Sequence, residues 1–185
     1  MMVMTNNALS LASYDFKPDD ELFLDTNVWL MVYGPQKPGD ARVAAYSQAL
    51  AKILAAQSLI HIDVLIVSEF INAYARLKWK LVAPHINQFK VFRKSPKFKS
   101  VAQDIAADVK RVLKHCSRIE SGFEALDIDV LINGYGAGGS DFNDQVIAEL
   151  CKKKGLTLVT DDGDFGGQGI PVVTANTRLL GQLPP

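Results

Sequence analysis

Apolar and polar positions follow one another along the chain in a pattern that predicts strands separated by helices. Longer segments carry apolar residues three or four positions apart, which is typical of helices with one buried face. Between them lie short apolar or alternating runs, which are typical of strands in a buried sheet. These runs occur at 21–25, within 59–67, and at 125–131, 156–160 and 170–174. The alternation favours an α/β fold with a parallel central sheet and helices on both faces.

Capping side chains mark where most of the helices are expected to begin. Short polar side chains at a helix start accept hydrogen bonds from backbone N–H groups that have no partner inside the helix. Gly155 is expected to close the helix that precedes the strand at 156–160, because glycine readily adopts the left-handed conformation found at helix ends. The expected helices cover 28–33, 41–57, 69–80, 84–92, 100–118 and about 141–153.

The length of 185 residues is sufficient for one domain with a hydrophobic core. Residues 1–20 are polar and precede the first expected strand, so we expect them to form an N-terminal arm. Residues 21–180 are expected to form a single domain. Within it, the segment 81–124 has a helical pattern and many basic residues, and we expect it to be an insertion.

The composition is that of a globular protein, with 48% hydrophobic and 22% charged residues. The formal net charge is zero, so the chain lacks the overall basic excess of many nucleic-acid binders. Cys116 and Cys151 are far apart and are expected to be reduced thiols. No apolar stretch is long enough to span a bilayer and the start does not resemble a signal peptide, so a cytoplasmic location is expected.

Acidic residues follow two of the expected strands directly. Asp25 ends the run ELFLD, and the acidic turn 161–164 follows the run LTLVT. Ligand sites of open α/β sheets form outside the carboxyl ends of the strands, where the strand order reverses. Glu69 and Asp144 are expected in the first turns of helices, and helices that follow strands begin near the same edge. The sequence therefore predicts that four acidic clusters converge there.

Converging carboxylates require something that offsets their repulsion. Two like charges at about 4 Å cost on the order of 4 kcal/mol at an effective dielectric constant of 20. Protonation of one carboxyl group is one answer. A hard divalent cation is the other, and a site made only of oxygen ligands suits Mg²⁺ or Mn²⁺. Such an ion can activate water and stabilise the charge of a phosphodiester under attack.

Each acid also has a simpler structural explanation. Asp25 can cap the helix behind it, and Glu69 in a first helical turn can complement the helix dipole. Asp141 is expected to be a cap, with Asp144 as its capping partner. The segment 161–164 can be an ordinary acidic turn. Capping alone does not easily explain why all of these acids are expected at one edge of the sheet.

Three sequence blocks resemble the successive motifs of the PIN-domain family. They are LFLDTNVWL at 22–30, VSEFINAY at 67–74 and SDFNDQVIAELCKKKGLTLVTDDGDF at 140–165. The blocks come in the family's order, the third is the most specific, and the resemblance covers residues 21–80 and 125–180. It implies a three-layer α/β/α fold with a central parallel sheet of about five strands.

The resemblance also implies a function and a set of site residues. The family is dominated by ribonucleases whose acidic site binds Mg²⁺ or Mn²⁺, and its bacterial members are often toxins of VapC-type toxin–antitoxin pairs. Asp161 is a further acid beside Asp162, and the choice between these two stays open. Carried over position by position, the catalytic and metal-binding acids are Asp25, Glu69, Asp144 and Asp162, Asp164 is a further metal ligand, and Asn27 and Thr160 orient the carboxylates.

The implied partners are an RNA substrate, a second copy of the chain in a homodimer, and a small antitoxin protein. An antitoxin would occupy the acidic groove by placing an arginine among the carboxylates. This chain is longer than a compact toxin of the family because of the residues before the first strand and the segment 81–124. These departures bear on the substrate and on the toxin assignment.

The basic stretch 78–99 allows two interpretations. Its aromatic residues are interleaved with basic residues, which would suit RNA binding through phosphate contacts and base stacking. The alternative is a solvated helical face with the aromatic rings in the core, and we favour it because aromatics at helical spacing usually pack inside. The candidate RNA-binding residues are Arg93, Lys94, Lys97 and Lys99.

Two other functions remain as alternatives to a ribonuclease. One is a different Mg²⁺-dependent phosphoryl-transfer enzyme, such as a phosphatase of the haloacid-dehalogenase type. That type expects a second aspartate two residues after the first, where this chain has Asn27. The other is a non-catalytic RNA-binding protein, against which the presence of all four acids argues. Nuclease assays with and without EDTA separate these possibilities.

Overall fold

The computed structural model describes residues 8–35 and 39–181, and it contains one sheet in which all neighbouring strands are parallel. The order across the sheet is β1-β6-β5-β2-β3-β4. This arrangement confirms the expected α/β class with a central parallel sheet, with six strands in place of about five. The strands are β1 (Ala8–Ser10), β2 (Glu21–Leu24), β3 (Leu59–Ile62), β4 (Cys116–Arg118), β5 (Thr157–Val159) and β6 (Val172–Thr174).

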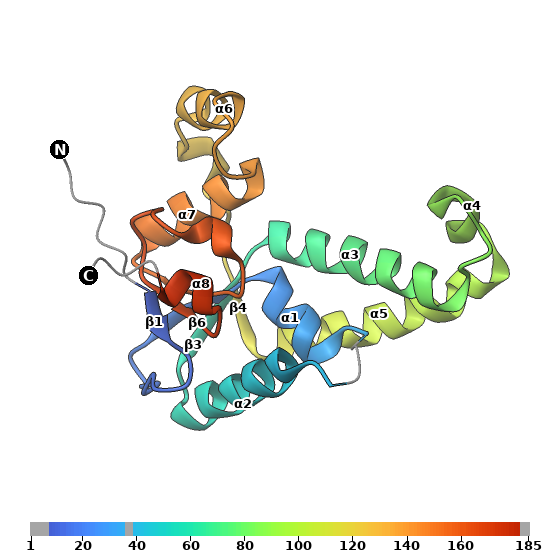
Figure 1. Cartoon of the computed structure of the whole chain (residues 1–185), viewed down its shortest axis with the longest axis horizontal. Coiled ribbons are helices and arrows are strands. Elements are labelled where there is room, and N and C mark those ends of the chain that lie inside the picture. Colours follow the sequence, from blue (N-terminus) through green and yellow to red (C-terminus); the bar gives the residue numbers. More distant parts are fainter. Residues whose placement is uncertain (1–7, 36–38, 182–185) are drawn as a thin grey trace.

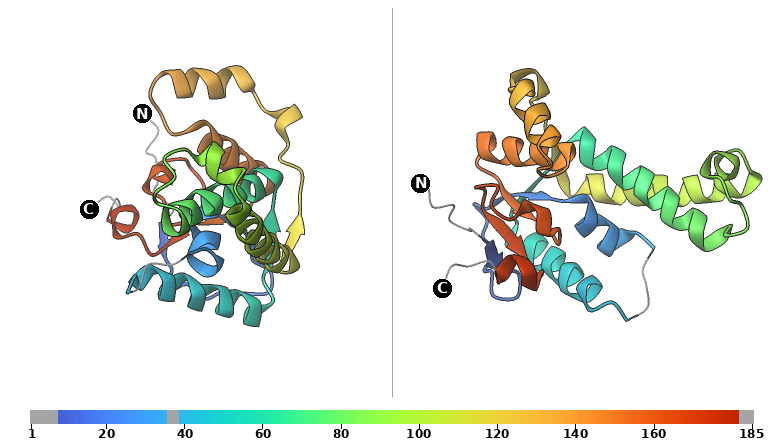
Figure 2. Two further views of the ribbon diagram at one scale, coloured as in Figure 1. Left: turned by 90° about the vertical axis from the view of Figure 1, so that its right-hand side faces the viewer. Right: turned by 45° about the horizontal axis from the view of Figure 1, so that its top comes forward.

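Helices cover both faces of this sheet. In Figure 1, α7 lies above the strands and α2 below them, which gives three layers, and Figure 2 shows the same arrangement from two further directions. No helix in the described part of the chain is long and apolar enough to cross a membrane. The helices are α1 (Thr26–Tyr33), α2 (Ala41–Ala56), α3 (Val64–Val82), α4 (Phe89–Arg93), α5 (Pro96–Lys114), α6 (Ile128–Gly136), α7 (Phe142–Lys154) and α8 (Thr177–Leu180), with 3₁₀ turns η1 (Phe123–Ala125) and η2 (Gly163–Phe165).

The central strand β2 is buried on both faces, which explains its continuous apolar sequence. Leu22, Phe23 and Leu24 are all fully buried. Trp29 of α1 and Tyr46 of α2 are buried as well, and they belong to the same hydrophobic core. The residue that follows β2, Asp25, therefore lies next to the buried core and is itself buried.

The region 116–136 differs from the expectation. The run 125–131 was expected to be a strand, but it contains the start of α6, with Asp127 capping the helix by accepting a hydrogen bond from Val130 N at 3.2 Å. The apolar residues of this run fit both the period of a strand and the period of a helix. Asp127 decides for the helix because it provides the N-terminal cap. The helix expected to reach residue 118 ends at Lys114, because residues 116–118 pair with β3 as β4.

Helix α3 begins five residues earlier than the sequence predicts. Asp63 caps it by accepting a hydrogen bond from Ile66 N at 3.0 Å, so the run at 64–67 is helical and Ser68 is not the cap. A short apolar run of this kind fits a buried strand and a buried helix equally well. Glu69 therefore lies in the second turn of α3, where a helix-dipole explanation of its charge is weak.

Residues 8–20 are part of the fold, whereas residues 1–20 were expected to form an arm. Residues 1–7 lie outside the described residues. From Ala8 onward the chain forms β1, which pairs with β6, and the side chains of Leu11 and Phe16 are buried. These apolar residues attach the segment to the core despite its polar composition.

Helices α3, α4 and α5 extend away from the sheet in Figure 1 and form what we call the helical projection, residues 70–114. Its interior contains a row of aromatic rings. The ring centroids of Trp79 and Phe89 are 5.5 Å apart, and those of Phe92 and Phe98 are also 5.5 Å apart. Phe92 is fully buried, and the other three rings are partly buried against the core. The aromatic residues of the stretch 78–99 therefore pack inside, as the favoured interpretation expects.

Candidate functional site

Asp25 lies at the centre of the sheet, directly after β2. Its backbone N–H donates to the carbonyl oxygen of Val159 at 3.0 Å, which links the ends of β2 and β5. From β2 the chain moves to β3 on one side, whereas β5 and β6 lie on the other side, so the strand order reverses between β2 and β5. This is the position at which open α/β sheets form their ligand sites.

Three donors fix the carboxylate of Asp25. Its Oδ1 atom accepts from Thr26 N at 2.6 Å. Its Oδ2 atom accepts from Asn27 Nδ2 and from Thr160 Oγ1, both at 2.6 Å. Thr160 is fully buried, so this network cannot be replaced by solvent. Asn27 and Thr160 both contact Asp25, which is the geometry that an orienting role requires.

Asp161 and Asp162 face different partners. Asp161 Oδ1 accepts from the hydroxyl of Tyr46 at 3.0 Å, and its Oδ2 atom forms an ion pair with Arg42 at 3.1 Å. The backbone N–H of Asp162 donates to Thr160 Oγ1 at 2.9 Å. The charge of Asp162 raises the pKa values of other site carboxyl groups, as described below, whereas Asp161 is held against α2.

Glu69 of α3 and Asp144 of α7 come close to the acids at the strand ends. The pKa of Asp144 is raised to about 7, chiefly by burial, and repulsion by Asp162, Asp25, Asp141 and Glu69 contributes to this shift. Burial also raises the pKa of Glu69, with repulsion by Asp141 and Asp162 contributing. Glu69 is exposed as a whole residue.

The pKa of Asp25 is raised to about 6, chiefly by burial. The hydrogen bond from Thr160 opposes the shift, whereas the charges of Glu69 and Asp162 increase it. No described lysine, arginine or histidine forms an ion pair with Asp25, Glu69, Asp144 or Asp162. The structure thus brings the four predicted acids within electrostatic reach of one another without a compensating cation from the described side chains.

Asp141 is an acid of this group that the sequence reasoning assigned to capping alone. It does cap α7, since its Oδ1 atom accepts from Phe142 N at 2.8 Å. Its charge also raises the pKa values of Asp144 and Glu69. The spacing of three residues between Asp141 and Asp144 was the available signal, because such residues are neighbours on a helical surface.

Asp164 lies at the margin of the acidic group. Its side chain is exposed, and its backbone N–H donates to Asp162 Oδ1 at 3.0 Å. Its charge is not among those that raise the pKa values of Asp25, Glu69 and Asp144. The contact places Asp164 next to Asp162 without bringing it between the other carboxylates.

The donor set fits a hard divalent cation in its chemistry. It offers only oxygen ligands and a concentrated negative charge. Among the described residues, no three acidic side chains come close enough together to form a ready-made metal-binding group. Mg²⁺ usually retains several waters and uses only one or two carboxylates directly, so the arrangement fits an ion held partly through water.

The candidate RNA-binding residues Arg93, Lys94, Lys97 and Lys99 lie elsewhere. All four are exposed, and they belong to the outer end of the helical projection around α4. Figure 1 shows this end far from α7 and the strand ends. The structure therefore does not place them in the acidic group.

The family model that describes the PIN domain matches residues 22–167, which include all four acids. The chain belongs to the PIN-domain family. PIN domains are usually nucleases, so the acidic group of this PIN domain lies in a fold associated with the hydrolysis of nucleic acids. The match begins in β2 and ends just after η2, so β1, β6 and α8 lie outside the matched range.

A solved structure with a similar arrangement is the crystal structure of PAE2754 from Pyrobaculum aerophilum. It shares 16% sequence identity with this PIN domain, and the alignment covers 93% of this chain and 94% of that chain with a TM-score of 0.49. No curated protein sequence matches the chain.

Proposed function

We propose that this PIN domain is a metal-dependent endoribonuclease that hydrolyses RNA phosphodiester bonds. The observation that carries the proposal is the group of four carboxylates from β2, α3, α7 and the loop after β5. The charges of Glu69 and Asp162 raise the pKa of Asp25, and those of Asp162, Asp25 and Glu69 raise the pKa of Asp144. No described cationic side chain pairs with any of the four carboxylates. Such a group is unfavourable for folding, so a ligand that needs it is the simplest reason for its presence.

The proposed metal ligands are Asp25, Glu69, Asp144 and Asp162, directly or through water, with Asp164 assisting from the margin. When bound, Mg²⁺ or Mn²⁺ would stabilise negative charge on the phosphodiester and lower the pKa of water. Thr160 and Asn27 hold the Asp25 carboxylate in one orientation, so no conformational freedom has to be lost there on binding.

Contacts of Asn27 favour this function over a phosphatase of the haloacid-dehalogenase type. Its Nδ2 atom donates to Asp25 and Thr160, and its Oδ1 atom accepts from Asp161 N at 3.1 Å. Both ends of the amide are therefore used to position other residues. An aspartate here could not donate to Asp25, so the amide belongs to the positioning network.

The direct test is a cleavage assay on labelled single-stranded RNA with Mg²⁺, with Mn²⁺ and with EDTA. We expect internal cleavage with either metal and none with EDTA. Asp25→Asn and Asp144→Asn should each abolish cleavage, whereas Asp129→Asn, at an exposed position of α6, should cleave like the wild type. Metal-dependent cleavage by both site variants at wild-type rates would show that the assignment is wrong.

We further propose that the protein acts in the cytoplasm as the toxin of a type II toxin–antitoxin pair. The proposed partners are an antitoxin with an arginine for the acidic group and a second copy of the chain. Induction of the wild type should arrest growth, induction of Asp144→Asn should not, and a small protein should copurify. Normal growth and no partner would exclude the toxin role without excluding RNA cleavage.

We also propose that residues 21–180 form one PIN-like domain together with β1, which pairs with β6. Helices α4 and α5 of the segment 81–124 would be a helical insertion, whereas β4 of the same segment belongs to the central sheet. The family match begins at residue 22, within β2. Helices α4 and α5 account for much of the segment, which supports its helical character.

A further inference from the structure

Positive charge is concentrated in the helical projection. The whole chain has 20 basic and 20 acidic residues, yet no acid occurs between Glu69 and Asp104. This stretch contains eight basic residues, so the projection is strongly positive although the chain is neutral. The eight residues are Arg76, Lys78, Lys80, Lys90, Arg93, Lys94, Lys97 and Lys99.

Most of these charges are exposed and unpaired. Lys78 is partly buried and forms an ion pair with Asp104 at 3.6 Å. The other seven side chains are exposed, and none of them forms an ion pair with another described residue. Like charges at this density repel one another, so a polyanion would bind here with a favourable electrostatic free energy.

The aromatic rings of the projection already contact other groups of the protein. The guanidinium group of Arg76 lies 4.8 Å from the ring centroid of Phe89, and that of Arg93 lies 5.8 Å from the centroid of Phe98. Trp79 Nε1 donates to the carbonyl oxygen of Ile86 at 2.8 Å. These rings serve the interior packing of the projection, so nucleotide bases have few free faces to stack on.

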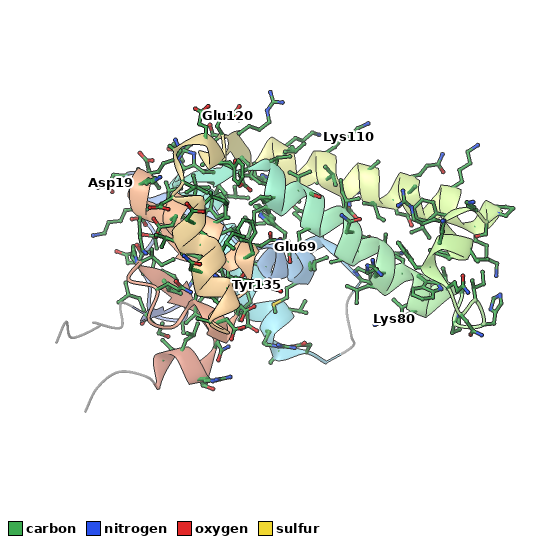
Figure 3. The ribbon with its side chains drawn as sticks, turned by 90° about the horizontal axis from the view of Figure 1, so that it is seen from above. Asp19, Glu69, Lys80, Lys110, Glu120 and Tyr135 are labelled. Carbon is green, nitrogen blue, oxygen red and sulfur yellow. The ribbon has the colours of Figure 1, made fainter. Side chains whose placement is uncertain are left out.

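Helix α3 connects the acidic group to these cations along one line. Arg76 and Lys80 follow Glu69 by seven and eleven residues, which places all three within about 20° of one face at 3.6 residues per turn. At a rise of 1.5 Å per residue, Lys80 lies about 16 Å from Glu69 along the axis. Figure 3 shows Glu69 and Lys80 along α3, with Lys80 nearer the outer end.

We propose that the helical projection binds the phosphate backbone of single-stranded RNA and extends the substrate path outward from the acidic group. A line of cations matches a single phosphate backbone, and contacts to phosphate carry no base preference. The inference rests on the proposed ribonuclease function, which it deepens: the preferred substrate is RNA long enough to reach from the acids to the outer end, whatever its sequence there.

Binding measured in EDTA tests the surface independently of cleavage. The probe is a labelled single-stranded RNA of about 30 nucleotides, longer than the ~4–16 nucleotides typical of one single-strand binding site. The variant K80Q/K94Q/K97Q neutralises three exposed cations of the projection. The control K17Q/K52Q/K154Q neutralises three exposed lysines outside the helical projection, so the net charge changes equally.

We expect the projection variant to raise the Kd about tenfold and to reduce the slope of log Kd against log salt by about 2, at about 0.7 per lost phosphate contact. The control should change neither quantity.

Equal effects of both variants, or no effect, would overturn the proposal. Binding to a peptide of the acidic residues 119–141 in preference to RNA would assign the surface to a second copy of the chain and would also overturn it. If the wild type binds RNA in EDTA but does not cleave it when metal is added, the result would contradict the proposed ribonuclease function alone.

Discussion

Thr160 Oγ1 donates a hydrogen bond to Asp25 Oδ2 at 2.6 Å, across 135 residues of sequence. The same hydroxyl accepts from Asp162 N at 2.9 Å and from Asn27 Nδ2 at 3.1 Å. One buried hydroxyl therefore uses its donor and both acceptor positions. It connects the acid after β2 to the acid after β5, so the relative position of these two carboxylates depends on it.

Replacement of Thr160 by valine should therefore disturb both stability and function. Valine keeps the shape but leaves Asp162 N and Asn27 Nδ2 without this acceptor, which should cost about 1–3 kcal/mol of unfolding free energy. Metal affinity and cleavage should fall roughly 10–100-fold, as is typical when a group that orients a ligand is removed. Urea unfolding and metal titration measure the two effects. Thr160→Ser keeps the hydroxyl and should retain most of both, and equal defects in the serine and valine variants would contradict the argument.

Asp161 and Asp162 provide a matched pair of substitutions. Asp162→Asn should reduce cleavage by more than the roughly 10–100-fold typical of outer-shell partners, with little change in melting temperature. Asp161→Asn should leave cleavage nearly intact but lower stability by about 1 kcal/mol, because it weakens the contacts with Arg42 and Tyr46. Initial cleavage rates and thermal melts of the two variants show which of the two acids acts in cleavage and which in stability. The reverse pattern would show that Asp161 is the functional acid.

The acids at the strand ends were predictable because strand periodicity and sheet topology determine where those ends meet. Asp25 and Asp162 follow short apolar runs that the alternation with helices predicts to be buried strands, and parallel strands bring their carboxyl ends to one edge. The choice between Asp161 and Asp162 depends on Arg42 and Tyr46 of α2, and such contacts across the fold leave no trace in a local pattern.

Other features were not predictable because two local structures fit the same residues. The run VLIV at 64–67 fits a strand or a helix, and the cap at Asp63 decides for the helix. The run 125–131 alternates like a strand, yet Asp127 starts α6, where only Leu131 is buried. Burial by tertiary contacts normally distinguishes a strand from a helix in such a run, but few residues of α6 are buried.

Asp141 should contribute to metal binding in addition to capping α7. Asn keeps the capping oxygen, so Asp141→Asn should leave the melting temperature of the metal-free protein unchanged. Removal of one negative charge near Asp144 and Glu69 should weaken Mg²⁺ binding about 3–10-fold, which corresponds to about 0.7–1.4 kcal/mol. Isothermal titration with Mg²⁺ measures the change. An unchanged affinity would restrict Asp141 to its capping role, and Asp129→Asn on α6 serves as the control for a remote charge.

The stability of the metal-free protein should fall as the pH rises from about 4 to about 7. The folded-state pKa of Asp144 is raised from 3.8 to about 7, so the folded state retains a proton that the unfolded chain releases. The stabilising contribution is therefore fully present below about pH 4, is lost progressively through this window and stays absent above it. Asp144 is partly exposed, so a discounted loss on the order of 1–2 kcal/mol is expected at about 1.4 kcal/mol per pKa unit.

Urea unfolding in EDTA across this range, for the wild type and Asp144→Asn, isolates the effect from titratable groups outside the acidic group, which contribute equally to both proteins. The difference in unfolding free energy should favour Asp144→Asn increasingly toward pH 7. At neutral pH, Mg²⁺ at 100 times its Kd should stabilise the wild type by about 2.7 kcal/mol, and the variant should gain much less. A difference that stays constant between pH 4 and 7 would show that Asp144 does not carry the raised pKa. The repulsion from Asp25, Asp141 and Asp162 would then be absent in solution, and the case for a shared acidic group would fail with it.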